Sequence, residues 1–188
     1  MTSESSLPAS ARVANLSWSE VDAQARRACV DLWHLVWPDD DPAGPAARLA
    51  RTDPIYAALD AMQLHLAYDG TSLRAVARTF LHTVTLDGNP VEIVALASVC
   101  SDPNHRGQGW GDAVVNAAFE RVDSEGRPAF FQSPVPKYYE RFGARTVQNK
   151  IFTSIDGADA FSDPWAMIYP GDSSWEDTAR IDLCAPGW

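Results

Sequence analysis

Residues 102–111 combine glycines with an arginine in an arrangement that can hold a phosphate group. The stretch reads Asp-Pro-Asn-His-Arg-Gly-Gln-Gly-Trp-Gly, with Arg106 directly before the first glycine. Glycine lets backbone N–H groups approach an anion closely, and the N-terminus of a following helix adds the positive end of its dipole. The spacing differs from the Rossmann G-x-G-x-x-G fingerprint, and no Gly-Lys-Ser/Thr follows, as a P-loop requires. We therefore expect a phosphate-binding turn of another kind.

A second motif lies further along the chain, where residues 138–144 read Tyr-Tyr-Glu-Arg-Phe-Gly-Ala. Together with the R-G-x-G-x-G pattern after Asp-Pro, it resembles the GNAT superfamily of N-acetyltransferases, whose acyl-CoA loop is followed by an F-Y-x-x-x-G-F helix end. The resemblance implies that acetyl-CoA is the cosubstrate. It also implies the residues that hold acetyl-CoA, which are strand residues for the pantetheine and loop residues for the pyrophosphate: Val99, Ser101, Arg106, Gly107, Gln108, Gly109, Trp110 and Gly111.

Acetyl transfer to an amine also needs groups that move protons. Tyr139 is the candidate general acid, because a phenol with a pKa of about 10 can supply a proton to a thiolate whose thiol has a pKa of about 8.5. Glu92 and His82, on strands expected beside the site, are the candidate bases, and Asp102 or His105 of the loop or a water relay are alternatives. Core packing of Tyr139 and a structural or solvated role for the others are the competing interpretations.

The C-terminal residues resemble one particular group within the GNAT superfamily. Residues 177–188 are similar to the tail of the aminoglycoside 2'-N-acetyltransferases, which also has an Asp-Thr, a later Cys and a terminal Trp. In that family, acidic groups and the terminal carboxylate hold the amines of the substrate. The matching positions, with two tryptophans that could stack on a sugar or face an amine, are Trp37, Asp39, Asp40, Asp41, Asp163 and Trp188.

Two departures from that family bear on the substrate pocket. Ala97 stands where the family has a glutamate in the strand before the loop, and Pro186 stands where it has an aspartate near the end of the tail. Both suit a smaller or differently built sugar, such as kasugamycin. The alternative is a GNAT enzyme that acts on a polyamine, an amino-acid derivative or a protein N-terminus. A third interpretation is a non-catalytic acyl-CoA-binding module.

The charge and the cysteines restrict the possible partners. The formal net charge of −10 favours a cationic substrate and disfavours nucleic acids and anionic membranes. The cysteines, Cys29, Cys100 and Cys184, are too few and too widely spaced for a disulfide framework or a zinc site, so no metal is expected. Because there is neither a leader-like N-terminus nor an apolar run of bilayer length, we expect a cytoplasmic protein. The family resemblance implies a homodimer.

The elements that must position these residues follow from periodicity and turn signals. The apolar run Val91–Cys100 predicts a buried strand, and apolar residues at helical spacing predict a helix from the loop to Ser124. Asp-Gly pairs at 69–70 and 87–88 separate this strand from expected strands at 63–68 and 74–86, which predicts an antiparallel meander. A right-handed crossover then places a strand at 127–132 parallel to the third.

Helix signals and late extended segments complete the prediction. A capping-box pattern at 17–20 predicts a helix to Leu35, ended by Pro38. A second helix is expected at 44–62, interrupted at Asp53-Pro54, and a short one at 134–142. Extended segments are expected near 146–155 and 165–169. The expected fold is the α+β GNAT fold, a mixed, mostly antiparallel sheet of six to seven strands flanked by about four helices. We expect a single domain at 13–188 after a disordered tail at 1–12.

Overall fold

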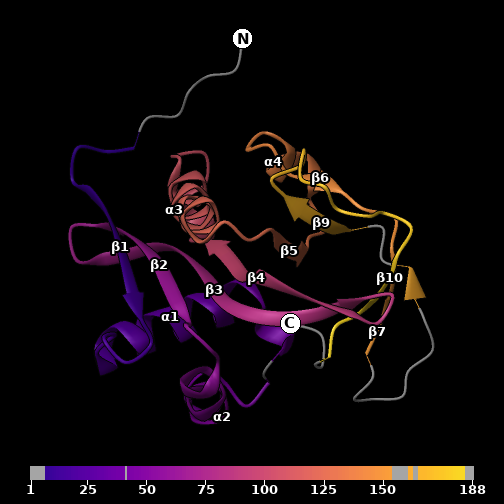
Figure 1. Ribbon diagram of the computed structural model, residues 1–188. Helices are drawn as coiled ribbons and strands as arrows, with labels where there is room; N and C mark the ends of the chain where they lie inside the picture. Colours follow the sequence, from indigo (N-terminus) through magenta and orange to yellow (C-terminus); the bar gives the residue numbers. More distant parts are fainter. Residues whose placement is uncertain (1–6, 41, 154–160, 163–164, 185–188) are drawn as a thin grey trace. The chain divides into compact units, whose positions relative to one another are not determined.

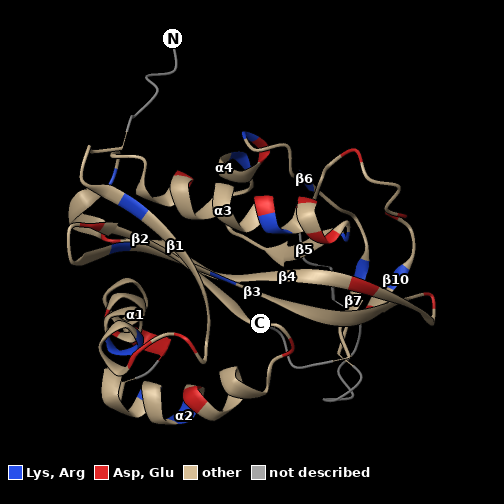
Figure 2. Ribbon diagram, turned by 60° about the vertical axis from the view of Figure 1, so that its left-hand side comes forward, with Lys and Arg blue, Asp and Glu red and all other residues tan. Residues whose placement is uncertain are grey.

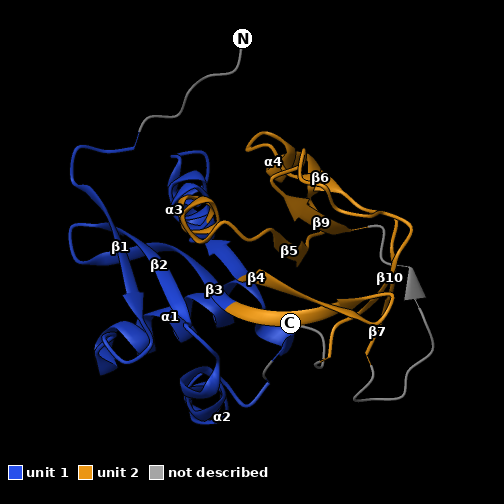
Figure 3. Cartoon of the chain, in the orientation of Figure 1, with its two compact units in different colours: residues 1–80, 98–118 blue, residues 81–97, 119–188 orange. Residues whose placement is uncertain are grey.

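A computed structural model describes residues 7–40, 42–153, 161–162 and 165–184 (Figure 1). The chain divides into two compact units: unit 1 comprises residues 1–80 and 98–118, and unit 2 comprises residues 81–97 and 119–188 (Figure 3). Three elements continue from one unit into the other, namely β3 (Ser72–Leu86), β4 (Asn89–Ser101) and α3 (Trp110–Glu125).

Unit 1 is built on three antiparallel strands. β1 (Ala11–Ser17) pairs with β2 (Gln63–Asp69), and β2 pairs with the first part of β3. The helices α1 (Ala23–Val36) and α2 (Pro45–Ala58) lie on one face of these strands, and the start of α3 lies on the other (Figure 1). The short 3-10 helices η1 (Pro38–Asp40) and η2 (Pro103–His105) follow α1 and β4. Buried apolar side chains such as Trp33 and Leu66 fill the space between these layers.

Unit 2 contains the rest of the sheet, in the order β6-β9-β5-β4-β3-β10-β7-β8. β5 (Ala129–Gln132) runs parallel to β4, as the crossover predicts, and β9 (Ala166–Tyr169) runs antiparallel to β5. Phe119 and Tyr169 stack with ring centroids 3.8 Å apart. The remaining elements are short: α4 (Pro136–Glu140), β6 (Arg145–Thr146), β7 (Lys150–Phe152), β8 (Phe161–Ser162) and β10 (Arg180–Asp182).

The expected α+β fold, with a mostly antiparallel sheet and the predicted meander and crossover, is confirmed. The sheet contains ten strands in the described part of the chain, more than the six to seven expected. β1 begins inside the segment expected to be a tail, and Val13 in it is 40% exposed, so the edge strand lacks a clear apolar face. Strands of two or three residues, such as β6, are too short to show a periodicity.

Two helix boundaries differ from the prediction. Ser17 and Glu20 do bond to each other, with Ser17 N–H and Oγ both donating to Glu20, but they form a turn. Helix α1 begins later, at Ala23, where Asp22 accepts from Ala25 N–H.

The second helix is not interrupted, because α2 continues through Pro54. The Asp53 carboxylate accepts from Trp18 Nε1 and Arg26 Nη1, both at 2.9 Å, which ties the helix to α1 and to the chain before it. Tertiary contacts therefore outweigh the helix-breaking tendency of proline. None of the helices in residues 7–40, 42–153, 161–162 and 165–184 has the length and apolar character needed to span a membrane.

Candidate active site

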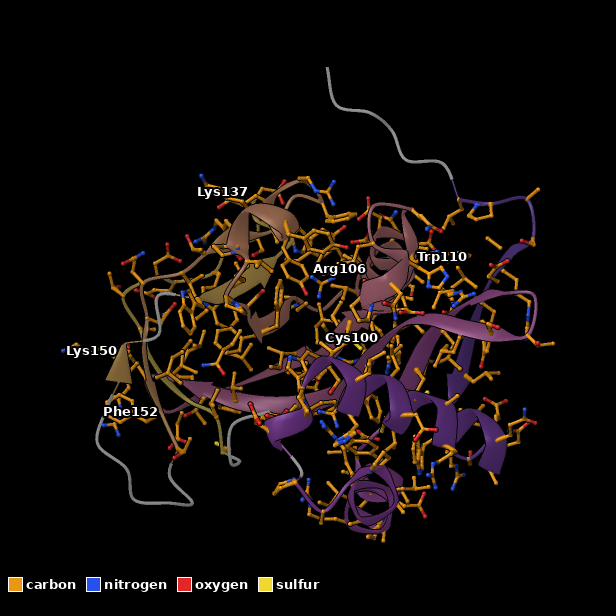
Figure 4. The ribbon with its side chains drawn as sticks, turned by 180° about the vertical axis from the view of Figure 1, so that it is seen from behind. Cys100, Arg106, Trp110, Lys137, Lys150 and Phe152 are labelled. Carbon is orange, nitrogen blue, oxygen red and sulfur yellow. The ribbon has the colours of Figure 1, made fainter. Side chains whose placement is uncertain are left out.

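The last residues of β4 have an irregular backbone. Ser98 has φ +53°, a left-handed conformation that non-glycine residues rarely adopt and that is often found at functional sites. The indole Nε1 of Trp33 donates to Ser98 O at 3.3 Å, which holds the irregular residue against α1. Val99 and Ser101, predicted to contact pantetheine, are half-buried on either side of the buried Cys100, which Figure 4 labels. The hydrogen bond from the buried Trp33 therefore fixes the end of β4.

The start of the glycine loop is anchored by Asp102. Its carboxylate accepts from His105 Nδ1 at 2.8 Å, from Asn104 N–H at 2.9 Å and from Arg74 Nη1 at 3.1 Å. The Asp102 N–H in turn donates to Arg74 O at 2.7 Å. Burial raises the pKa of Asp102, but these hydrogen bonds and the neighbouring positive groups lower its pKa more, so the net shift is downward. The ionised carboxylate thus joins the loop to β3.

The loop itself presents backbone donors. Gly107 and Gly109 have φ of +75° and +81°, which explains glycine at both positions. Arg106 is exposed, and Trp110, the buried first residue of α3, donates from Nε1 to Gln108 Oε1 at 3.3 Å (Figure 4). The first bond of α3 runs from Ala113 N–H to Gly109 O, so the N–H groups before it have no acceptor inside the helix. The N–H groups at the start of α3, beside an exposed arginine, fit a diphosphate.

Tyr139, the predicted general acid, lies in unit 2 on α4 and is 6% exposed. Its ring packs 4.9 Å from Phe131 of β5 and 5.0 Å from Tyr138. The backbone carbonyl of Tyr139 accepts from Phe142 N–H and Ala144 N–H, which ends the helix at the glycine-containing turn. The second motif is therefore a rigid, aromatic-packed helix end, and the acid role of Tyr139 stays a prediction.

The two predicted bases both have structural partners. Glu92 is at the start of β4, where its carboxylate, 68% exposed, lies 3.3 Å from Arg127. His82 on β3 donates from Nε2 to Leu183 O at 2.6 Å, which fixes the proton on that nitrogen. The contact of Glu92 is typical of a surface ion pair, and that of His82 is typical of a histidine that bridges two chain segments. Catalytic roles for Glu92 and His82 also stay predictions.

The residues expected to hold the acceptor are only partly described. Trp37 is the half-buried C-cap of α1, and Asp39 and Asp40 are exposed in η1. The other three, Asp41, Asp163 and Trp188, lie outside the described residues. Asp40 Oδ2 is 3.7 Å from Arg48 Nη2, and both charge signs occur on α1 and α2 (Figure 2). This face of unit 1 is therefore less acidic than the loop sequence indicates.

Sequence reasoning missed two buried arginines of unit 1, Arg48 on α2 and Arg78 on β3, which are 8% and 7% exposed. A signal for Arg78 was present, because it interrupts the apolar strand segment between Ala75 and Phe80. Arg48 gave none, since an arginine in an amphipathic helix is normally solvated.

The buried cysteines of unit 1 are poor nucleophiles. Burial raises the pKa of Cys29 to about 12 and also raises the pKa of Cys100. Neither thiol is therefore suited to carry an acyl group at neutral pH. Among the residues that the structure describes, no three His, Cys, Asp or Glu side chains are grouped so that they could hold a metal ion.

Comparison with known structures supports the fold assignment. YhbS of Escherichia coli, a GNAT family N-acetyltransferase in complex with CoA, is 15% identical with a TM-score of 0.61, and the match covers 94% of this chain and 91% of that one. A GNAT family acetyltransferase of Brucella melitensis in complex with acetyl-CoA is 11% identical with a TM-score of 0.59, covering 93% and 97%.

A longer protein contains the same fold as one part. A probable N-acyltransferase of Enterococcus faecalis is 15% identical with a TM-score of 0.60, and the match covers 73% of this chain. It covers only 32% of that chain, so the present chain spans about a third of that relative. At these identities the likeness shows the fold alone.

The family model described as the acetyltransferase (GNAT) domain matches residues 18–147. This range includes the irregular end of β4, the glycine loop and Tyr139, and it confirms the resemblance inferred from the two motifs. The chain belongs to the GNAT family of acetyltransferase domains.

Proposed function

We propose that the protein is an acetyl-CoA-dependent N-acetyltransferase that transfers the acetyl group directly to an amine, without a covalent enzyme intermediate. The observation that carries this proposal is the glycine loop of unit 1. It combines positive-φ glycines and the N–H groups at the start of α3 with an exposed arginine, in a chain of the GNAT family. The high pKa values of Cys29 and Cys100 support direct transfer.

Each part of the reaction has a candidate residue. Acetyl-CoA supplies the acetyl group as a thioester. The loop from Arg106 to Gly111 would hold its diphosphate, and backbone groups of Val99 and Ser101 would hold the pantetheine as an added strand would. The amine nitrogen attacks the carbonyl carbon, the carbon–sulfur bond breaks, and Tyr139 supplies a proton to the leaving sulfur. Glu92, His82 or a water relay would take the proton from the amine.

For the acceptor we propose an aminoglycoside, modified at its 2'-amino group or, for a kasugamycin-like compound, at an equivalent amine, so that the enzyme would confer resistance. The similar C-terminal tail and the net charge of −10 support this substrate. Trp37, the aspartates at 39–41, Asp163 and Trp188 are the proposed contacts. A polyamine, an amino-acid derivative or a protein N-terminus is the alternative acceptor. The family resemblance also supports a homodimer, which sedimentation velocity would test.

The test is thiol release from acetyl-CoA across a panel of aminoglycosides, kasugamycin and polyamines. Turnover of an aminoglycoside is the expected result. Turnover of spermidine alone would remove the antibiotic substrate but keep the enzyme. Binding of CoA with no turnover of any amine would instead indicate a non-catalytic acyl-CoA-binding module.

Two variants test the assigned roles. Tyr139→Phe should lower kcat with little change in the Kd for acetyl-CoA, whereas Tyr138→Phe, its neighbour on α4, should change neither. An unchanged kcat in Tyr139→Phe would refute the acid role. Arg106→Ala should weaken acetyl-CoA binding about tenfold, since charge-assisted contacts to phosphate are lost. Removal of Trp188 should raise the KM for the amine if the terminal carboxylate binds it.

A further inference from the structure

Arg78 is a buried cation of unit 1 that has no counter-charge among the described residues. Its guanidinium carbon lies 4.4 Å from the ring centroid of Tyr56 and 5.4 Å from that of Phe80. The structure gives it neither a hydrogen bond nor an ion pair with any other described residue, and Nε is fully buried without a partner. Burial lowers the pKa of Arg78, Tyr56 raises it, and the charge of Arg48 lowers it again. Arg48 lies nearby, because the Tyr56 ring that Arg78 faces is 5.8 Å from the ring of Trp33, which Arg48 faces.

Arg48 is also buried, and it has almost as few polar partners among the described residues as Arg78. Nε and Nη1 have no hydrogen-bond partner among the described residues, and only Nη2 approaches a carboxylate, at 3.7 Å from Asp40. The guanidinium carbon is 5.9 Å from the centroid of Trp33, a weak cation–π distance. Cation–π contacts compensate a buried cation less than its desolvation costs. The two arginines are thus arranged for an anion that residues 7–40, 42–153, 161–162 and 165–184 do not supply.

The position of the pair connects it to the proposed acceptor region. Arg48 reaches η1, where Asp39 and Asp40 were expected to bind an amine. Trp33, beside Arg48, donates to Ser98 O at the irregular end of β4. The pair therefore lies among residues that connect the acidic loop to the end of the strand that would carry acetyl-CoA.

We infer that Arg48 and Arg78 form a subsite that binds a carboxylate of the acceptor, so that the acceptor carries both an amine and a carboxylate. The inference rests on the proposed function and deepens it. Guanidinium groups present planar, forked donors that match the two oxygens of a carboxylate. The acidic side chains of η1 suit the ammonium end of the same molecule. A polyamine lacks the group that the buried pair requires.

The first arm of the test measures the stability of the ligand-free protein. Residues that keep unmatched charge for a ligand cost stability, so Arg78→Met should leave the melting temperature unchanged or raise it. The matched control is Arg26→Met, also in unit 1. Arg26 sits 4.7 Å from the Trp18 ring but bonds to Asp53, Val21 O and Trp18 O. Its loss should lower the melting temperature. An equal fall in both variants would overturn the inference.

The second arm measures ligand-induced shifts in melting temperature with CoA present. The probes are amines that differ in one carboxylate, lysine against cadaverine and ornithine against putrescine, together with kasugamycin, which has a carboxylate, and kanamycin, which has none. The carboxylated members should stabilise the wild type, and Arg78→Met should weaken their binding about 10- to 100-fold. Arg78→Lys should recover part of it. Stabilisation by the carboxylate-free members alone, or by none of the probes, would overturn the inference.

Calorimetry with CoA separates this inference from the proposed function. Wild type and Arg78→Met should bind CoA equally. If the wild type ignores CoA, the proposed function fails, while the stability arm still decides whether the pair is built for an anion. If Arg78→Met instead loses CoA affinity, the anion is a CoA phosphate and the acceptor subsite is refuted.

Discussion

Two charged clusters of unit 1 differ in whether their charges are balanced. In the first, Asp102 joins Arg74 and His105 through three donors to one carboxylate, whose side chain is 13% exposed. In the second, Arg48 and Arg78 are buried, only Arg48 approaches a carboxylate of the described residues, that of Asp40 at 3.7 Å, and Arg78 approaches none of them. Arg74 Nε of the first cluster also lacks a hydrogen-bond partner among the described residues, so the difference lies in the counter-charge: the first cluster has a carboxylate at hydrogen-bond distance and the second does not. The first cluster therefore belongs to the folding of the loop and the second to binding.

The largest effect is expected when the shared carboxylate of the first cluster is removed. Asp102→Ala leaves Arg74 and His105 without their shared acceptor and frees the start of the glycine loop. We expect the free energy of unfolding to fall by about 2 kcal/mol, because the hydrogen bonds of a half-buried ionised carboxylate are lost. Urea titration followed by circular dichroism measures this, and CoA binding should weaken in parallel.

The matched control is Asp69→Ala. Asp69 also approaches Arg74, but at 3.7 Å, and its side chain is 35% exposed. A long, solvent-screened pair contributes about 0.5 kcal/mol. Similar losses in the two variants would show that the Asp102 cluster does no more than a surface pair.

Acid should weaken the same cluster with a defined sign. The pKa of Asp102 is lower in the folded protein than in the unfolded chain, so its contribution is fully present above the unfolded value of about 4. The contribution is lost as the pH falls from about 4 through the lower folded pKa. Unfolding measured from pH 6 to pH 2 should show wild type and Asp102→Asn converging at the acid end. A constant difference over this range would refute the ionised anchor.

The second cluster should respond in the opposite direction. Arg48→Met removes a cation with two unpaired buried nitrogens and keeps most of the apolar volume. The free energy of unfolding of the ligand-free protein should rise by about 1 kcal/mol, because replacing unmatched buried charge with apolar atoms is often stabilising. Chemical denaturation of the two proteins side by side decides this. A fall of about 2 kcal/mol would mean that Arg48 is a structural residue.

The contrast between the clusters also explains what sequence reasoning could reach. Glycine at positions 107 and 109 indicates a backbone with positive φ, and the apolar run of β4 indicates a buried strand. The loop and its flanking elements could therefore be predicted from the sequence. The bonds of Asp102 to Asn104 and His105 belong to the same local segment, whereas its bond to Arg74 of β3 does not. Backbone conformation of this kind is determined by a few neighbouring residues, so it can be predicted from them.

The arginine pair depends on packing between distant segments. Arg48 lies on α2 and Arg78 on β3, where Arg78 faces the Tyr56 ring of α2, and nothing near either residue in the chain specifies that contact. The continuation of α2 through Pro54 has the same origin, since Asp53 is held by side chains from before and within α1. Local patterns therefore predicted the glycine loop and its flanking elements, whereas the buried arginines and the continuous helix α2 depend on tertiary contacts.

The smallest expected effect on stability comes from a variant of Asp40, and its kinetics distinguish an acceptor with a carboxylate from one with amines alone. Asp40 is 58% exposed and 3.7 Å from Arg48, so Asp40→Asn should change the free energy of unfolding by less than about 0.5 kcal/mol. If η1 binds only amines, the variant should raise the KM of every cationic acceptor. If Arg48 binds a carboxylate, removing its competing partner should lower the KM for a carboxylated acceptor about twofold and raise it for a polyamine. Steady-state kinetics with matched acceptors, such as lysine and cadaverine, measure both directions in one variant. A parallel rise for both compounds would assign the region to cation binding alone.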